Sequence, residues 1–173
     1  MNIGHFLYDY LVMKGMSETS AKYLNMLVLL ASLLVISFLV HFIIRKIIME
    51  LFTKFAAKTK SNFDDLLVKN KAPRNIAQII PLIVVLELVP IVFIDFTFFA
   101  GIVKKGLQVF AIVLILWIVR SLLNTLKDYF KTLSSLKDKP IDSYIQVIMI
   151  LAWVFGILSA FAIITGIEFI KFI

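Results

Sequence analysis

Apolar residues in this chain gather into four long runs, separated by polar and mainly basic stretches. The runs cover Leu24–Ile44, Ile76–Ile94, Leu107–Val119 and Ile141–Ile167. About 20 apolar residues in a helix, rising 1.5 Å each, cross a hydrocarbon core of roughly 30 Å. The third run is short, and it reaches that length if Lys104, Lys105 and Arg120 extend their charged ends to the membrane surface. The pattern therefore predicts four transmembrane helices.

The composition agrees with a membrane protein and argues against catalysis. Of the 173 residues, 61% are hydrophobic, and the mean hydropathy is +1.00, whereas soluble domains are about 45–50% apolar. The chain has no cysteine, and its two histidines, His5 and His41, are far apart in sequence. Thiolate or histidine metal sites are therefore not expected, nor is any cofactor. An enzyme would need polar residues clustered at one depth, and we expect none.

Basic residues give the orientation. Of the 18 lysines and arginines, 13 fall within residues 45–74 and 120–142, and five fall on the opposite side of the runs. By the positive-inside rule the two long connections are cytoplasmic and the N-terminus is outside, in a multi-pass inner or plasma membrane protein. The net charge of +7 indicates anionic lipids rather than nucleic acid as partners, because the basic residues flank helix ends. The candidates for lipid contact are Arg45, Lys46, Lys58, Lys60, Arg74, Arg120, Lys127 and Lys131; alternatively they serve only as topology signals.

The two long connections are themselves predicted to be helical and to repeat. Apolar residues continue at helical spacing after the first run (44, 47, 48, 51, 52, 55) and after the third (119, 122, 123, 126, 130, 133). Lys58-Thr59-Lys60-Ser61 and Lys131-Thr132-Leu133-Ser134 lie 73 residues apart, each before an acidic turn and a proline. We expect an all-α integral membrane bundle, built from two antiparallel hairpins (21–94 and 95–167) with amphipathic cytoplasmic extensions.

The N-terminal segment, residues 1–20, is predicted to be an interfacial helix. One apolar stripe at i, i+3, i+4, i+7 and i+8 comprises Ile3, Phe6, Leu7, Tyr10 and Leu11, which suits a helix lying on the outer membrane surface. Gly15 would end this helix, and Ser17 or Ser20 would cap the first span. A disordered leader is the alternative.

Paired aspartates form the most specific local string. Ser61 is expected to cap a new helix, with Asp64 and Asp65 in its first turn, where the helix dipole favours negative charge. The same carboxylates could instead pair with Lys58, with Lys60 or with a basic residue of the other hairpin, and the last pairing would lock the two hairpins together. No third ligand or base accompanies them, which argues against a metal site or a catalytic dyad.

Two features lie within the runs themselves. Glu87 falls near the middle of the second run, between Pro81 and Pro90. An ionisable group at that depth is costly, so it is either a protonated or hydrogen-bonded structural residue or part of a proton path. In the fourth run Ala152, Gly156 and Ala160 form a small-residue stripe that lets another helix approach closely. A fifth helix or a neighbouring hairpin is the expected occupant.

Several strings together resemble the transmembrane sensor region of the MscS-like mechanosensitive channels, most closely the miniconductance-type members. They are Lys60-Ser61-Asn62-Phe63-Asp64-Asp65-Leu66-Leu67, Pro81-Leu82, and Asp142-Ser143-Tyr144-Ile145-Gln146-Val147. The resemblance covers most of Tyr23–Gly166, although Phe63 stands where the family more often has tryptophan. It implies a homo-oligomer, a heptamer, whose outer helices act as tension-sensing paddles. It also implies a pore helix after these spans, and residues 168–173 are interpreted as its approach.

The expected function is thus the tension sensor of an ion channel that opens on membrane stretch and protects against osmotic down-shock. The alternative is a non-conducting membrane scaffold or assembly subunit that docks onto another complex. The first expectation depends on the repeated hairpins and the paired-aspartate string, whereas the second depends on the membrane helices alone.

Overall fold

A computed structural model describes residues 3–56, 62–133 and 140–167. These residues form a short 3-10 helix η1 followed by α-helices, and no strand occurs among them. The elements are η1 (Ile3–His5), α1 (Phe6–Met13), α2 (Glu18–Ala56), α3 (Phe63–Lys69), α4 (Ala72–Ile76), α5 (Ile79–Val92), α6 (Thr97–Thr132) and α7 (Ile141–Thr165). The predicted all-α fold is confirmed, with four helical segments long and apolar enough to cross a membrane. Residues 168–173, interpreted above as the start of a pore-helix region, lie outside the described residues.

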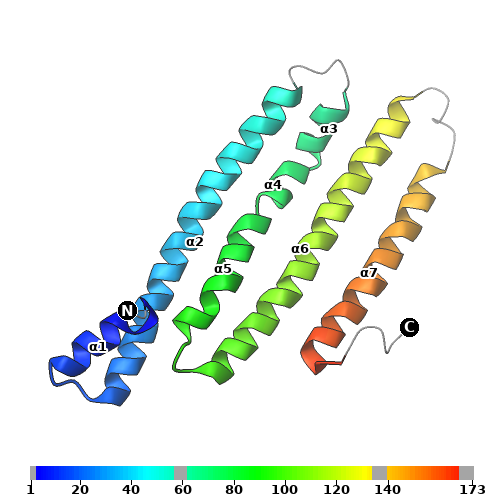
Figure 1. The fold of residues 1–173 in the computed structure, drawn as a ribbon. Coiled ribbons are helices and arrows are strands. Elements are labelled where there is room, and N and C mark those ends of the chain that lie inside the picture. Colours follow the sequence, from blue (N-terminus) through cyan, green and yellow to red (C-terminus); the bar gives the residue numbers. More distant parts are fainter. Residues whose placement is uncertain (1–2, 57–61, 134–139, 168–173) are drawn as a thin grey trace.

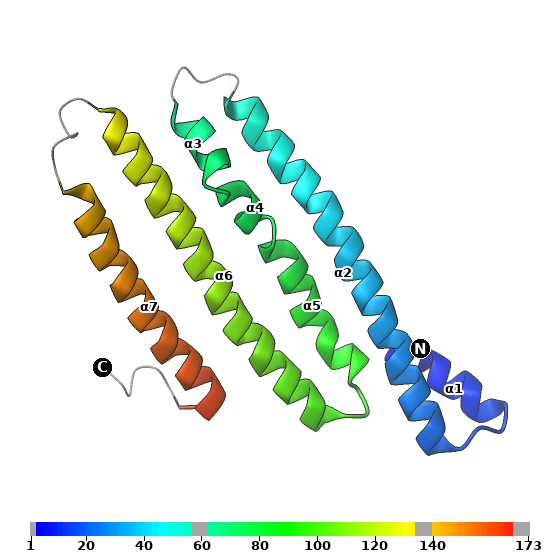
Figure 2. The ribbon, with the colours of Figure 1, turned by 180° about the vertical axis from the view of Figure 1, so that it is seen from behind.

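The long helices stand side by side in one layer (Figures 1 and 2). α2 packs against α5, α5 against α6, and α6 against α7, while α3 and α4 continue the line of α5. α2 and α7 therefore form the two edges of the layer. Because a single layer buries little surface, large apolar side chains such as Phe38 and Phe42 remain 70% and 65% exposed. These surfaces need an apolar solvent, which a lipid bilayer provides.

Two of the helices are much longer than a hydrocarbon core. α2 has 39 residues and α6 has 36, so each is over 50 Å long at about 1.5 Å per residue, against a core of roughly 30 Å. Beyond its apolar run, α2 continues over residues 45–56 and α6 over residues 120–132, the stretches predicted to be amphipathic extensions. The expectation that the helices continue past the apolar runs is confirmed, and the short third run lies within the uninterrupted α6.

The second apolar run is broken, where the sequence predicts one continuous helix. α4 ends at Ile76 and α5 begins at Ile79. Pro81 has no N–H to donate to the carbonyl of Ala77, so one helical hydrogen bond is missing at this point. The next turn begins when the N–H of Leu82 donates to the Gln78 carbonyl at 3.3 Å. The prediction of a span holds, but it consists of two helical pieces.

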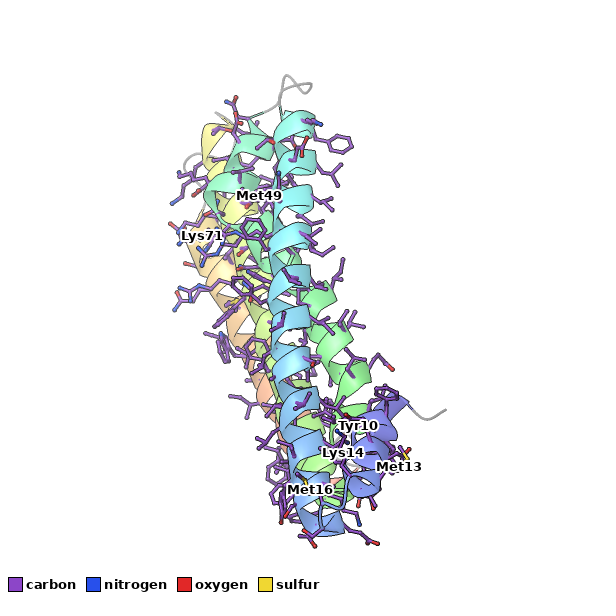
Figure 3. All side chains as sticks on the ribbon, turned by 90° about the vertical axis from the view of Figure 1, so that its left-hand side faces the viewer. Tyr10, Met13, Lys14, Met16, Met49 and Lys71 are labelled. Atoms are coloured by element: carbon purple, nitrogen blue, oxygen red, sulfur yellow. The ribbon has the colours of Figure 1, made fainter. Side chains whose placement is uncertain are left out.

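The N-terminal segment forms the short helix that the apolar stripe predicts. Gly15 ends the turn after α1 with a φ of +89°, which glycine adopts without steric cost. Ser17 accepts a hydrogen bond from the N–H of Ser20 and so caps the start of α2. α1 lies against α2 at the end of the layer where Met13, Lys14 and Met16 are labelled (Figure 3). Its contact with the outer membrane surface stays a prediction.

Asn25 is the residue that we expect to hold this segment in place. Its amide is 1% exposed and donates to the Gly4 carbonyl at 2.7 Å. Asn25→Ala removes this bond, worth about 1 kcal/mol, and should let the segment detach from α2. Because the chain has no cysteine, a single cysteine at the half-buried Leu7 can report detachment as faster maleimide labelling. Ser32→Ala is the control, since the Ser32 hydroxyl bonds only to Val28 of the same helix; equal labelling in both variants would contradict the expectation.

Candidate functional site

The sequence-predicted basic residues gather at one end of the layer, opposite to the α5–α6 turn. We call this end, residues 45–56, 62–74, 120–133 and 140–142, the basic end; it lies at the top of Figure 1. Arg45, Lys46, Arg74 and Arg120 are exposed there. Lys58 and Lys60 lie outside the described residues. The grouping follows from the hairpin topology, because α2 and α6 both reach this end before the chain returns.

Asp142 ties the second hairpin together at the basic end. Lys127 and Lys131 are four residues apart on α6, hence on one face of the helix. The Nζ atoms of these lysines each lie 2.8 Å from an oxygen of Asp142 in the first turn of α7. Two candidates for lipid contact thus have a carboxylate partner within the protein. All three side chains remain solvent-accessible, so the pairing adds register between α6 and α7 more than stability. Contact with lipid stays a prediction.

The paired aspartates lie where the sequence predicts, in the first turn of α3. Ser61, the expected capping residue, lies outside the described residues. Asn62 occupies the N-cap position and makes no side-chain capping bond there. Within the described part of the chain, no ion pair joins Asp65 to the second hairpin. The predicted ion pair between the hairpins is therefore not found at Asp65.

Asparagines that the sequence analysis did not single out make polar contacts between the hairpins. Asn75 of α4 donates to the Ser121 hydroxyl of α6 at 2.7 Å. Asn70, the C-cap of α3, donates to the Asp128 carboxylate at 3.1 Å. Lys69 lies 3.5 Å from the same carboxylate. These contacts line the basic end of the junction between the two hairpins, and we call them the polar seam.

Packing supports the polar seam on both sides. Thr125, one turn after Ser121 on α6, is fully buried and bonds to the Ser121 carbonyl at 2.8 Å. The rings of Phe63 and Tyr129 meet edge to face at 5.3 Å across the hairpins, a favoured aromatic geometry. In the sequence, the i, i+4 spacing of Ser121 and Thr125 within an apolar helix is the signal that could have predicted this contact between helices. Small hydroxyl residues at that spacing commonly face another helix in membrane proteins.

We expect the Asn75–Ser121 bond to couple the two hairpins measurably. Asn75→Ala and Ser121→Ala should each lower the free energy of unfolding in detergent by roughly 1 kcal/mol. The double mutant should lose less than the sum, with a coupling near the value of about 0.6 kcal/mol found for membrane helices. Pairing Asn75→Ala with Thr165→Ala is the control, because the Thr165 hydroxyl bonds within α7. Additive losses for Asn75 and Ser121 would show that the bond carries no coupling.

Glu87 points away from the neighbouring helices. It is exposed, and it lies on the same face of α5 as the exposed Ile80, Ile83 and Ile91. Among the described residues it has no hydrogen bond or ion pair with α2 or α6. Of the two structural possibilities, the hydrogen bond to a neighbouring helix of this chain is thus not found.

The described residues also contain no group of three or more acidic, histidine or cysteine side chains able to hold a metal ion.

Gly156 makes the close helix contact that the small-residue stripe predicts. It is buried, and a Cβ placed on it would lie 2.7 Å from Leu116 Cδ1 and 3.4 Å from Ile112 Cγ2. Both neighbours belong to α6, so the occupant at this position is the other helix of the same hairpin. The expected occupants were a fifth helix or a neighbouring hairpin. Ala152 and Ala160, on the same side of α7, are half-buried.

Comparison of the chain with protein-family models, curated proteins and solved structures finds no match.

Proposed function

We propose that this chain is the tension-sensing membrane region of a mechanosensitive ion channel, similar to the MscS-like channels that its sequence strings resemble. The observation that carries the proposal is the single layer of two apolar hairpins. In a closed bundle each helix turns one side inward and away from lipid, whereas in a single layer both faces of the long helices can meet lipid. A large lipid contact is what a sensor of bilayer stretch requires.

Tension would act through differential lipid contact. A conformational equilibrium shifts only if the two states interact differently with the perturbing agent. Helices longer than the bilayer can change their tilt, and a tilted layer occupies more membrane area than an upright one. Stretch would then favour the more tilted state of the hairpins. The polar seam would transmit that motion from the first hairpin to the second, because it joins α3 and α4 to α6.

Patch-clamp recording tests the proposal directly. Membrane patches containing the complete protein should give currents that open with applied suction, and cells expressing it should survive osmotic down-shock better than cells without it. Loss of the Asn75–Ser121 bond should shift the tension threshold, while Thr165→Ala should leave it unchanged. A well-expressed, correctly inserted protein that gives no tension-gated current would refute the channel proposal.

The proposed orientation places the basic end in the cytoplasm. A membrane-impermeant maleimide applied from outside should label a cysteine at Met16, which is exposed at the α1 end (Figure 3). It should not label a cysteine at Lys54, exposed at the basic end, until the membrane is permeabilised. The physical reason is the excess of lysine and arginine at the basic end. The reverse labelling pattern would overturn the orientation.

A non-conducting scaffold is the second candidate. The edge helices α2 and α7 carry exposed apolar side chains such as Phe38 and Phe155, and these edges could dock onto helices of another complex. Normal insertion, absence of current and stable recovery with one defined membrane partner would favour this function over the channel.

A further inference from the structure

Two grooves adjoin at the basic end of the layer. One, of about 380 Å³, lies where α3 and α4 meet α6, and the other, of about 330 Å³, lies between α6 and α7. Arg120 and Asn124 of α6 line both. The two hollows therefore meet across one helix, and we refer to them together as the paired groove. Its walls come from both hairpins.

The paired groove is cationic. Four basic side chains and one carboxylate line it: Lys69, Lys71, Arg120, Lys127 and Asp142. Lys69 lies near Asp128, and Lys127 pairs with Asp142. Within the residues that the structure describes, Lys71 and Arg120 have no ion-pair partner. Two cations at one groove without a protein anion favour an external anion, and arginine is well suited to bind phosphate.

Local backbone geometry positions Lys71. It is the N-cap of α4 and has a left-handed φ of +63°, a conformation that costs a non-glycine residue about 1 kcal/mol or more. Pro73 follows within the first turn of α4 and favours a helix start there. Figure 3 shows Lys71 projecting from the side of the layer away from α1.

Each groove has a tryptophan on its side toward the middle of the spans. Trp117 precedes Arg120 by about one turn of α6, and Trp153 lies about two turns beyond Gln146 on α7. Because α6 and α7 are antiparallel, both tryptophans lie on the span side of the charged residues. Leu123, Ile145 and Met149 add apolar wall. Tryptophan favours the depth at which headgroups give way to acyl chains.

We infer that the paired groove is a binding site for an anionic phospholipid of the cytoplasmic leaflet. The phosphate contacts Arg120 and Lys71, polar headgroup atoms reach Asn124 and Gln146, and the acyl chains pass Trp117 and Trp153. Free phosphate is also an anion, but it would leave the apolar wall without an occupant. The inference rests on the proposed membrane orientation and not on channel activity. It gives the tension sensor a ligand that joins both hairpins.

The two tryptophans are the only ones in the chain, so intrinsic fluorescence reports on the paired groove directly. The protein is reconstituted in phosphatidylcholine vesicles containing small amounts of phosphatidylglycerol or phosphatidylcholine with brominated acyl chains, which quench nearby tryptophan. We expect stronger quenching by the brominated anionic lipid. Arg120→Gln and Lys71→Gln should each reduce the preference for the anionic lipid by about fivefold, the effect of one basic residue near an anionic surface.

Arg45→Gln is the matched control, since Arg45 is exposed at the same end but does not line the paired groove. It should retain the preference. Equal quenching by the two lipids, or equal loss in Arg45→Gln, would overturn the inference. Loss of the preference on adding inorganic phosphate at constant ionic strength would assign the site to free phosphate and also refute it. Tension-gated current is not measured in these vesicles, so a failure here is distinct from a failure of the proposed function.

Discussion

Gly156→Leu is expected to separate α6 from α7 and to lower the free energy of unfolding by about 1–3 kcal/mol, the usual cost of overfilling a packed contact. A Cβ at this position already lies 2.7 Å from Leu116 Cδ1, and leucine adds three more carbon atoms in the same direction. Leu116 is only 5% exposed, so it has little room to turn aside. Unfolding in mixed detergent, followed by circular dichroism, measures the change.

Gly106→Leu on α6 isolates the packing contribution. Both substitutions replace glycine in a long helix, so both gain about 0.8–1.0 kcal/mol of helix propensity. Nothing lies within 4 Å of a Cβ at Gly106, and this variant should therefore be as stable as the parent or more so. Equal stability of the two variants would show that the close contact at Gly156 is unimportant for the hairpin.

The helical segments and their order could be predicted because transfer into lipid dominates their energetics. Each apolar run corresponds to a helical segment long enough to cross a membrane, the second one made of α4 and α5. Gly15 and Pro73 lie at the helix boundaries where their backbone preferences place them. The break before α5 was also within reach, since Pro81 cannot donate to the Ala77 carbonyl. The side of the membrane remains a prediction from the distribution of charge.

The single layer could not be predicted from the apolar pattern. A helix that is apolar all round gives no periodic signal to separate a side facing lipid from a side facing protein. Leu33 is 5% exposed, whereas Leu34, its neighbour in sequence, is 63% exposed. The same residue type thus serves both environments, and only the three-dimensional arrangement distinguishes them.

The polar seam was missed for a related reason. Asp64 and Asp65 attract attention as adjacent charges, and both lie in the first turn of α3, where the helix dipole favours negative charge. Asn70 and Asn75 find their partners 58 and 46 residues away, and a lone asparagine in a connection looks like an ordinary turn residue. The paired groove could not be predicted for the same reason, because Lys71 and Arg120 belong to different hairpins and are far apart in the sequence.

Glu87→Leu is expected to stabilise the inserted protein by about 3 kcal/mol, the cost of one charged residue at mid-membrane depth. Glu87 is exposed on α5 beside Ile83 and Ile91, and no neighbouring helix among the described residues satisfies its carboxylate. Leucine would remove the desolvation cost without disturbing a contact. Glu87→Gln should give a smaller gain, because the amide is neutral but still polar.

Glu50→Leu is the control, since Glu50 is exposed at the basic end and pairs with Lys54 at 2.6 Å. It should bring no gain, because its carboxylate is not at the depth of the hydrocarbon core in the proposed orientation. Insertion efficiency and unfolding free energy in vesicles measure both variants. A loss of stability or of oligomer recovery in Glu87→Leu would contradict the lipid-facing interpretation. That result would mean that Glu87 bonds to another chain, because a carboxylate facing only lipid cannot be more stabilising than leucine.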